Sequence, residues 1–347
     1  AMTLQGCGQK EKTGKTEIEL VQYKPEAVKT FEKIEEEFNR THDDIHLTIE
    51  SPNDAMTVLK TRFIREDNPD IIGIGGDVNY SNFIDSDMLM DISDYKGMED
   101  IKEAYKEIDK NLEFVPEKGT YAVPYVANAA GILYNKEMFE EHGWKIPTTW
   151  DELMSLCQEI QNAGIQPFNY SDKDNYHFEH LMSALALKAY GTSIADDLAS
   201  DKEAYNGEKM VAIYQKMKDM IDAGYWGDGI LSTDFNTERN MFEAGKAAFT
   251  VDGTWNCGNF QNDSDTTLFD AQKIGVTRIP YIDEANKTVE MGGGSDTYYI
   301  TTLNKSDEEI AATVKFIKYL TSVDFHQRNV ANSSPTTYAE KVTIDTG

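Results

Sequence analysis

Aromatic and polar residues stand directly after the predicted β-strands of this sequence. Amides, carboxylates and hydroxyls hydrogen-bond to ligand hydroxyl groups, and aromatic rings pack against apolar C–H faces. Ligands of parallel α/β sheets bind beyond the carboxyl ends of the strands, so we expect these residues to contact a ligand. The candidates are Tyr23, Asn53, Asp77, Tyr80, Tyr125, Asn128, Tyr176, Trp255, Asn256, Ser295 and Asp296.

Trp255 is the strongest candidate for stacking against a ligand, because it follows Gly253 at the end of a predicted strand over 247–251. The sequence contains 18 tyrosines, so ordinary packing remains the alternative for each tyrosine candidate. Asp77 and Asp296 fit hydrogen bonding within a turn as well as ligand contact. These residues indicate binding rather than chemistry.

The sequence contains no pattern that indicates catalysis. Because 61 residues are acidic, the carboxylate pairs of a glycoside hydrolase are expected by chance and carry little weight. Neither G-x-S-x-G nor H-E-x-x-H occurs. His177 and His180 fall on one helical turn, but a solvated or capping role is favoured because no further histidine lies near. We therefore expect no catalytic residue, no metal and no cofactor.

Charge and cysteine content exclude further classes. The formal net charge of −28 would repel a phosphate backbone and anionic lipid headgroups, so nucleic acid is not an expected partner. Three scattered cysteines argue against a disulfide framework and a zinc site. Cys157 lies on the apolar stripe of a predicted helix, which indicates a buried thiol.

The elements that must position the candidates alternate between strand and helix. Strands are predicted at 17–23, 45–49 and 71–74, with amphipathic helices between them, the first of them opened by Pro25. This alternation indicates βαβ units and a parallel sheet. The glycines at 73, 75 and 76 follow the third strand but lack the spacing of a dinucleotide-binding motif. Thr149 and Glu152 have capping-box spacing, and 347 residues suit two domains.

The N-terminus carries a possible anchoring signal. Residues 4–7 read Leu-Gln-Gly-Cys, which resembles the lipobox of bacterial lipoproteins, and a polar stretch follows that suits a flexible tether. This resemblance implies lipidation at Cys7 and attachment to the outer face of the cell membrane. A chance cysteine in a tail is the alternative.

Three motifs carry a wider resemblance. They are G-T-Y-A-V-P at 119–124, G-I-L-Y-N-K-E-M-F at 131–139, and G-W-K-I-P-T-T-W-D-E-L at 143–153. Weaker matches are N-P-D-I at 68–71, F-E-A-G-K-A-A-F at 242–249, G-T-W at 253–255, G-V-T-R-I-P at 275–280 and the glycine-rich 292–295. Together they resemble the family 1 extracellular solute-binding proteins, over nearly the whole chain after the tether.

The resemblance implies a fold and a domain plan. The fold is α/β, two-lobed and of the type II periplasmic-binding-protein kind, each lobe a mainly parallel sheet flanked by helices, with a hinge between them. Residues 1–16 would form the lipobox and tether, 17–124 with 275–321 the first lobe, and 125–274 with 322–347 the second. Relatives continue past Pro335, so we expect part of the C-terminal helical region to be absent.

The implied function is that of the extracytoplasmic substrate-binding component of an ABC importer. It would capture a carbohydrate, expected to be an oligosaccharide, in the interlobe cleft by hinge closure and deliver it to the membrane permease. It would act as a monomer and would not be an enzyme. Binding of a polyamine or peptide, a secreted carbohydrate-active enzyme, and a surface-anchored glycan-binding module without a transporter remain alternatives; the βαβ alternation argues against the last.

Overall fold

The computed structural model describes residues 14–24, 27–75, 83, 88–94, 99, 101–103, 105–107, 119–173, 177–253, 273–322 and 325. Among these, the chain forms two compact units. The first unit takes the chain up to Ala127 and again from Gly294, and the second is built from Asn128–Gly293. The chain therefore passes between the units within two strands, β4 and β8.

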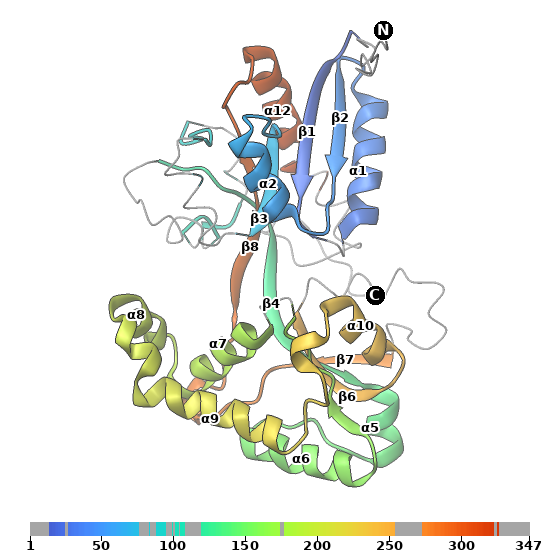
Figure 1. Cartoon of the computed structure of the whole chain (residues 1–347), viewed down its shortest axis with the longest axis vertical. Helices are drawn as coiled ribbons and strands as arrows, with labels where there is room; N and C mark the ends of the chain where they lie inside the picture. The colour runs from blue at the N-terminus through green and yellow to red at the C-terminus, as the bar shows by residue number, and fades with distance from the viewer. Residues whose placement is uncertain are drawn as a thin grey trace, which may run out of the picture. The chain divides into compact units, whose positions relative to one another are not determined.

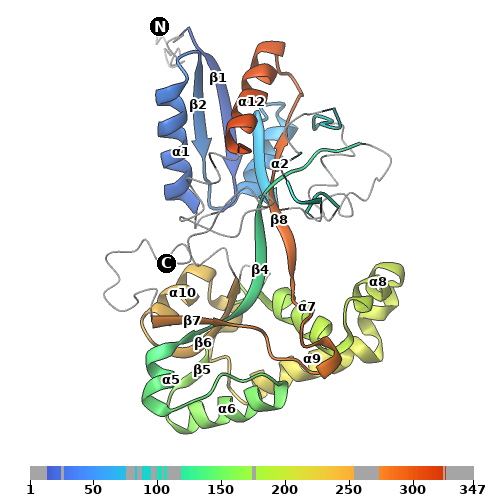
Figure 2. The same cartoon turned by 180° about the vertical axis from the view of Figure 1, so that it is seen from behind.

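The sheet of the first unit begins with three parallel strands in the order β2-β1-β3. They are β1 (Thr16–Gln22), β2 (Ile45–Glu50) and β3 (Ile71–Gly75). β8 (Gly292–Ile300) runs antiparallel beside β3. The helices are α1 (Val28–Thr41), α2 (Ala55–Ile64) and α12 (Asp307–Leu320). α2 and α12 lie on opposite faces of this sheet (Figures 1 and 2).

Alternation along the strands explains the two faces of this sheet. Leu20 packs in one buried cluster with Phe38 of α1 and Phe316 of α12. The next residue, Val21, points to the other face and packs in a cluster with Leu59 of α2. Strands with both faces buried account for the apolar runs in the sequence.

The second unit mixes strand directions. Its strands are β4 (Val123–Asn135, shared with the first unit), β5 (Gln166–Phe168), β6 (Ala247–Gly253) and β7 (Ile274–Thr277). Among the described strands of this unit, β6 and β7 both pair antiparallel with β4, whereas β5 and β6 pair in parallel. The expected mainly parallel sheet is therefore found in β1–β3 of the first unit, whereas antiparallel pairs dominate here.

Helices cover the sheet of the second unit. They are α5 (Lys136–His142), α6 (Trp150–Asn162), α7 (His177–Tyr190), α8 (Ser193–Ser200), α9 (Glu208–Asp222) and α10 (Phe235–Glu243), with short 3-10 turns at Lys202–Asn206, Ile230–Ser232 and Glu284–Asn286. Phe168 and Phe249 pack with residues of α6, α7 and α9 in one large cluster. Leu133 meets Phe242 of α10 in a separate small cluster.

The start of α6 confirms the predicted capping box. The Thr149 hydroxyl accepts a hydrogen bond from Glu152 N at 3.2 Å, and Glu152 Oε2 accepts one from Thr149 N at 3.1 Å. Each bond satisfies an amide that the first helical turn leaves without a partner. On the same helix Cys157 is fully buried, and burial raises its pKa to about 12. The prediction of a buried thiol is confirmed.

Two predicted boundaries differ from the structure. The segment 275–293, expected in the first lobe, belongs to the second unit, because β7 forms a ladder with β4. At the other end Phe325, expected in the second lobe, packs in the core of the first unit. The glycine-rich run at 292–294, one of the weaker matches to the family, opens strand β8.

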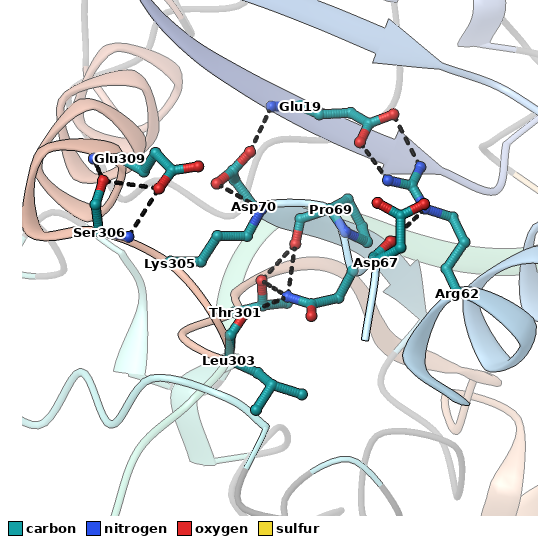
Figure 3. A network of polar contacts seen from close by, with 11 residues as sticks. Glu19, Arg62, Asp67, Pro69, Asp70, Thr301, Leu303, Lys305, Ser306 and Glu309 are labelled. Atoms are coloured by element: carbon teal, nitrogen blue, oxygen red, sulfur yellow. Dashed lines mark hydrogen bonds and ion pairs between the residues drawn. The ribbon is translucent and has the colours of Figure 1, made fainter. Parts of the chain in front are cut away.

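A buried ion pair ties the C-terminal return of the first unit to its sheet. Figure 3 shows Asp70, just before β3, between β1 and the segment that precedes α12. Its Oδ2 accepts a hydrogen bond from Glu19 N at 2.8 Å, and its Oδ1 lies 3.0 Å from Lys305 Nζ. Arg62 of α2 holds both carboxylate oxygens of Glu19, which is a bidentate pair. Segments more than 200 residues apart in sequence are joined here.

Asn68 adds a second link between the same segments. Its Nδ2 donates to Thr301 Oγ1 at 3.0 Å and to the carbonyl of Leu303 at 3.1 Å. The Thr301 hydroxyl in turn donates to the carbonyl of Pro69. Because Asn68 and Thr301 are both buried, these bonds replace lost contacts with water. The N-P-D motif of the sequence is therefore a structural joint.

Candidate ligand-binding site

The carboxyl edge of the β1-β3 sheet presents an aromatic side chain. Tyr23 directly follows β1 and is 36% exposed. Its hydroxyl reaches Gly75, the last residue of the neighbouring strand β3. A half-exposed ring beside this strand end offers a surface on which the apolar face of a ligand can stack.

The residues on either side of Tyr23 are buried. Gln22 is 1% exposed and Lys24 is 8% exposed. Gln22 Nε2 donates to the carbonyl of Lys24 at 3.0 Å and to Ser51 Oγ at 2.7 Å, and Gln22 Oε1 accepts from Lys24 N. The Gln22 amide thus holds the chain around Tyr23 and ties it to the residue that follows β2.

Asn53 lies on the same sheet edge, in the turn between β2 and α2. It is exposed, so a ligand can reach it. Its neighbour Asp54 caps α2, since its carboxylate accepts a hydrogen bond from Thr57 N at 3.0 Å. That cap fixes the turn and leaves the Asn53 amide at the surface.

Strand pairing brings Asp296 to this edge as well. In the antiparallel pair of β3 and β8, Asp296 stands opposite Gly75. The backbone of Ser295 and Asp296 therefore runs beside the end of β3, although their side chains are outside the described part. Tyr23, Gly75 and Asp296 come from segments far apart in sequence and meet at one end of the first unit.

Tyr125 and Asn128 lie in β4 and differ in environment. Tyr125 is only 8% exposed, and its ring stacks on Tyr298 with centroids 4.0 Å apart and planes at 12°. Tyr125 therefore packs largely in the core of the first unit, and its contact with a ligand stays a prediction. Asn128 is half-buried and is the first residue of the second unit.

The strand ends of the second unit carry a buried polar network. Glu238 of α10 is 3% exposed. Its Oε1 accepts from Thr250 Oγ1 of β6 at 2.6 Å, and its Oε2 accepts from Ser171 Oγ and lies 3.2 Å from His177 Nδ1. Its backbone carbonyl accepts from the amide of Asn169. One carboxylate thus joins the segment after β5 to β6, α7 and α10.

The serine, histidine and carboxylate of this network do not form a catalytic triad. In a triad the carboxylate holds one ring nitrogen of histidine and the serine hydroxyl contacts the other. Here Ser171 Oγ lies 3.0 Å from His177 Nδ1, and Glu238 contacts that same nitrogen. All three residues are also buried, with 1–3% of each exposed. The network stabilises the segment rather than activating a nucleophile.

The sequence between 24 and 325 matches the family model described as bacterial extracellular solute-binding protein. The chain belongs to this family. A multiple sugar-binding protein of Streptococcus mutans is 27% identical over 91% of this chain and 74% of its own length. Other curated relatives are matched over half to three fifths of their length.

Solved structures give the same fold for this solute-binding protein. A protein from a study of xylan utilisation by Caldanaerobius polysaccharolyticus has a TM-score of 0.83 and 19% identity, over 94% of this chain and 83% of that one. RafE, known from Streptococcus pneumoniae and solved in complex with raffinose, has a TM-score of 0.78 and 24% identity, over 95% and 84%. The predicted type II fold is confirmed, and the family and these relatives are binding proteins.

Several predicted residues of the solute-binding protein are not among those that the structure describes. Asp77, Tyr80, Tyr176, Trp255, Asn256 and Cys7 lie outside the described residues. Within the described ranges, no group of three or more histidine, cysteine, aspartate or glutamate side chains is arranged to hold a metal ion. None of the helices described there is both long and apolar enough to cross a membrane.

Proposed function

We propose that this solute-binding protein captures a carbohydrate and releases it unchanged. The observation that carries the proposal is the half-exposed Tyr23 ring at the carboxyl edge of the first sheet, in a chain that belongs to this family. Sugar rings have apolar C–H faces that pack on aromatic side chains and hydroxyls that pair with amides and carboxylates. The relatives, among them a multiple sugar-binding protein and a protein solved in complex with raffinose, support this ligand class.

Three residues of the described part of the chain are proposed to contact the ligand. Tyr23 stacks on the sugar and Asn53 binds its hydroxyls from the first unit, with Asn128 acting from the second. The remaining contacts are proposed on the sequence alone. They are Asp77, Tyr80, Tyr176, Trp255, Asn256, Ser295 and Asp296.

The protein binds its ligand without chemistry in this proposal. Support comes from the buried Ser171–His177–Glu238 network, in which one ring nitrogen serves both partners. Support also comes from the family, whose matched relatives are binding proteins.

The proposed physiological role is delivery of the sugar to an ABC importer. The family description places its members outside the cytoplasm, which fits a partner permease in the membrane. We further propose that the protein is a monomer and is anchored to the outer face of the cell membrane by a lipid on Cys7. The lipobox-like residues before Cys7 support the anchor.

A thermal-shift panel tests the ligand class. The purified chain is heated with raffinose, maltotriose, diacetylchitobiose and xylo-oligosaccharides, and separately with polyamines and short peptides. A ligand that binds only the folded state stabilises it by about 2.7 kcal/mol at a hundredfold excess over Kd. We expect the melting temperature to rise with at least one glycan and with no polyamine or peptide.

A pair of tyrosine variants tests whether Tyr23 takes part in glycan binding. Tyr23→Ala should abolish the glycan-induced shift, whereas Tyr205→Ala should preserve it, because Tyr205 is similarly exposed at 44% but lies in the second unit away from the strand ends. A shift with polyamines or peptides alone would replace the proposed ligand class. Equal shifts in both variants would remove Tyr23 from the site.

A further inference from the structure

Strand β3 contains two glycines, Gly73 and Gly75, close to the candidate site. Gly73 and Gly75 are separated by one residue, so their missing side chains belong to the same face of the strand. The face is the one on which Ile71 packs with residues of α1 and α12. Glycine weakens a strand unless another group occupies the space of its side chain. Both positions are occupied in this way.

The stem of Gln22 fills the space above Gly73. The two residues stand opposite each other in the parallel pair of β1 and β3. A methyl group at Gly73 would lie 3.3 Å from Gln22 Cβ and 3.6 Å from Tyr298 Cδ1. Gly73 therefore lets the Gln22 side chain lie flat over β3, where its amide turns back to the backbone of Lys24.

The Tyr23 hydroxyl fills the space above Gly75. A methyl group at Gly75 would lie 3.2 Å from Tyr23 Oη and 3.8 Å from Tyr23 Cζ. An extended chain would point Tyr23 to the face opposite Gln22. Its hydroxyl instead reaches the face that Gly73 and Gly75 share, so the chain turns after Gln22. The two hydrogen bonds between Gln22 and Lys24 span that turn.

We propose that Gln22 is a positioning residue for the ligand-binding side chain of Tyr23. Gly73 and Gly75 have no side chains, and this leaves room for Gln22 and Tyr23. Gln22 holds the turn over Gly73, and the turn lays the Tyr23 ring beside the end of β3 with its hydroxyl over Gly75. The orientation of the ring then decides how a sugar stacks. This inference rests on the proposed function of Tyr23.

A double-mutant cycle tests the fit between Tyr23 and Gly75. Gly75→Ala places a methyl group against Tyr23 Oη, so it should lower the unfolding midpoint in urea and weaken glycan binding about fivefold to tenfold. In the Tyr23→Phe background the nearest remaining contact is 3.8 Å, an ordinary distance. There Gly75→Ala should change neither quantity. An equal effect of Gly75→Ala in both backgrounds would overturn the proposal.

A matched pair of amide variants tests the role of Gln22. Asn39 of α1 provides a comparable side-chain amide. It donates a hydrogen bond to the carbonyl of Leu47 and accepts one from Leu47 N, both at 2.8 Å, and Leu47 lies in the middle of β2. Gln22→Met and Asn39→Leu should both lower the melting temperature. Only Gln22→Met should also weaken binding, by about tenfold. If Gln22→Met binds as the wild type does, or both variants bind equally weakly, Gln22 is not a positioning residue.

The glycan-binding measurements and the urea unfolding of the double-mutant cycle test the proposed function and this inference separately. Binding is measured with the glycan of the panel that shifts the wild-type chain most. If no glycan binds the wild type, the proposed carbohydrate function fails, and the urea cycle at Gly75 still tests the packing of Tyr23. If a glycan binds and the cycle shows no coupling, the function stands and this inference fails.

Discussion

Replacement of Glu238 by alanine is expected to lower the free energy of unfolding of the second unit by about 3–5 kcal/mol. The carboxylate is buried and accepts hydrogen bonds from Thr250 and Ser171 while it pairs with His177. Its removal leaves those buried groups without their acceptor and opens a cavity between α10 and β6. Urea unfolding followed by circular dichroism measures the loss. The matched control is Glu159→Ala, at an exposed position of α6, which should change stability little.

The stability that Glu238 contributes through His177 is expected to depend on pH, and the pKa of His177 determines the direction. Burial acts to lower the pKa of His177, but the hydrogen bond and charge of Glu238, with the charge of Asp252, raise it above the usual value. A raised pKa gives stability that is complete below the unfolded value of about 6.5 and is lost as the pH rises through the folded value. The stability difference between wild type and Glu238→Gln should therefore be larger at about pH 6 than at about pH 9. Neighbouring His180 does not interfere, because burial and His177 lower its pKa to about 4.

A loss below about 1 kcal/mol for Glu238→Ala would show that the network is dispensable. A stability difference that stays constant between the two pH values would show that His177 does not depend on Glu238 for its charge.

Replacement of Lys305 by methionine is expected to have the second large effect. It should lower the free energy of unfolding of the first unit by about 3–5 kcal/mol. Asp70 is 4% exposed and would lose the cation 3.0 Å away. Burial already raises the pKa of Asp70 in spite of Lys305, so the ion pair only partly offsets the cost of burying this carboxylate. Without the lysine the first unit must hold an uncompensated charge or protonate it. Thermal and urea unfolding of the variant measure the cost.

Two variants of this region serve as controls. Lys315→Met, on α12, removes an ion pair with Asp44 whose partners are both exposed, so we expect a much smaller loss. The double variant Asp70→Asn with Lys305→Met removes both charges and should regain part of the stability. If Lys305→Met costs no more than Lys315→Met, the joint seen in Figure 3 does not hold the first unit together.

Local patterns in the sequence predicted most elements of the fold. The strands at 16–22, 45–50 and 71–75 were visible because apolar residues alternate or run together where both sheet faces are buried. The capping box at Thr149 and Glu152 was visible because it depends on two residues three positions apart. These signals are contained within a few neighbouring residues, which is why they can be seen without the fold.

The same local patterns do not show which distant strands pair with each other. The partner of β7 is β4, some 140 residues earlier, and this pairing moved the segment 275–293 to the second unit. Glu238 was missed because a glutamate in an acidic chain has a solvated surface as its ordinary setting. Its spacing held a signal, since Phe235, Glu238 and Phe242 fall on one helical face, and Phe242 is buried.

The places of some candidate residues in the fold could be predicted from the sequence, whereas their packing could not. Tyr23 and Asn53 lie at the carboxyl ends of parallel strands, which sequence order and strand direction determine. Tyr125 proved to be packed against Tyr298, a contact that depends on the pairing of β4 with a strand far along the chain. The roles of Gly73 and Gly75 depend on which side chains of β1 lie over them, and only the register of the strands shows that.

Equilibrium dialysis tests the central claim most directly. The chain is dialysed against the glycan that shifts its melting temperature most, and the glycan in both chambers is then identified by mass spectrometry. We predict that the protein chamber retains about one glycan per chain, as expected for a single binding site, and that the recovered glycan has its original mass. Retention of none of the glycans, or recovery of cleaved or modified glycan, would contradict the account of a carbohydrate-binding protein that performs no chemistry.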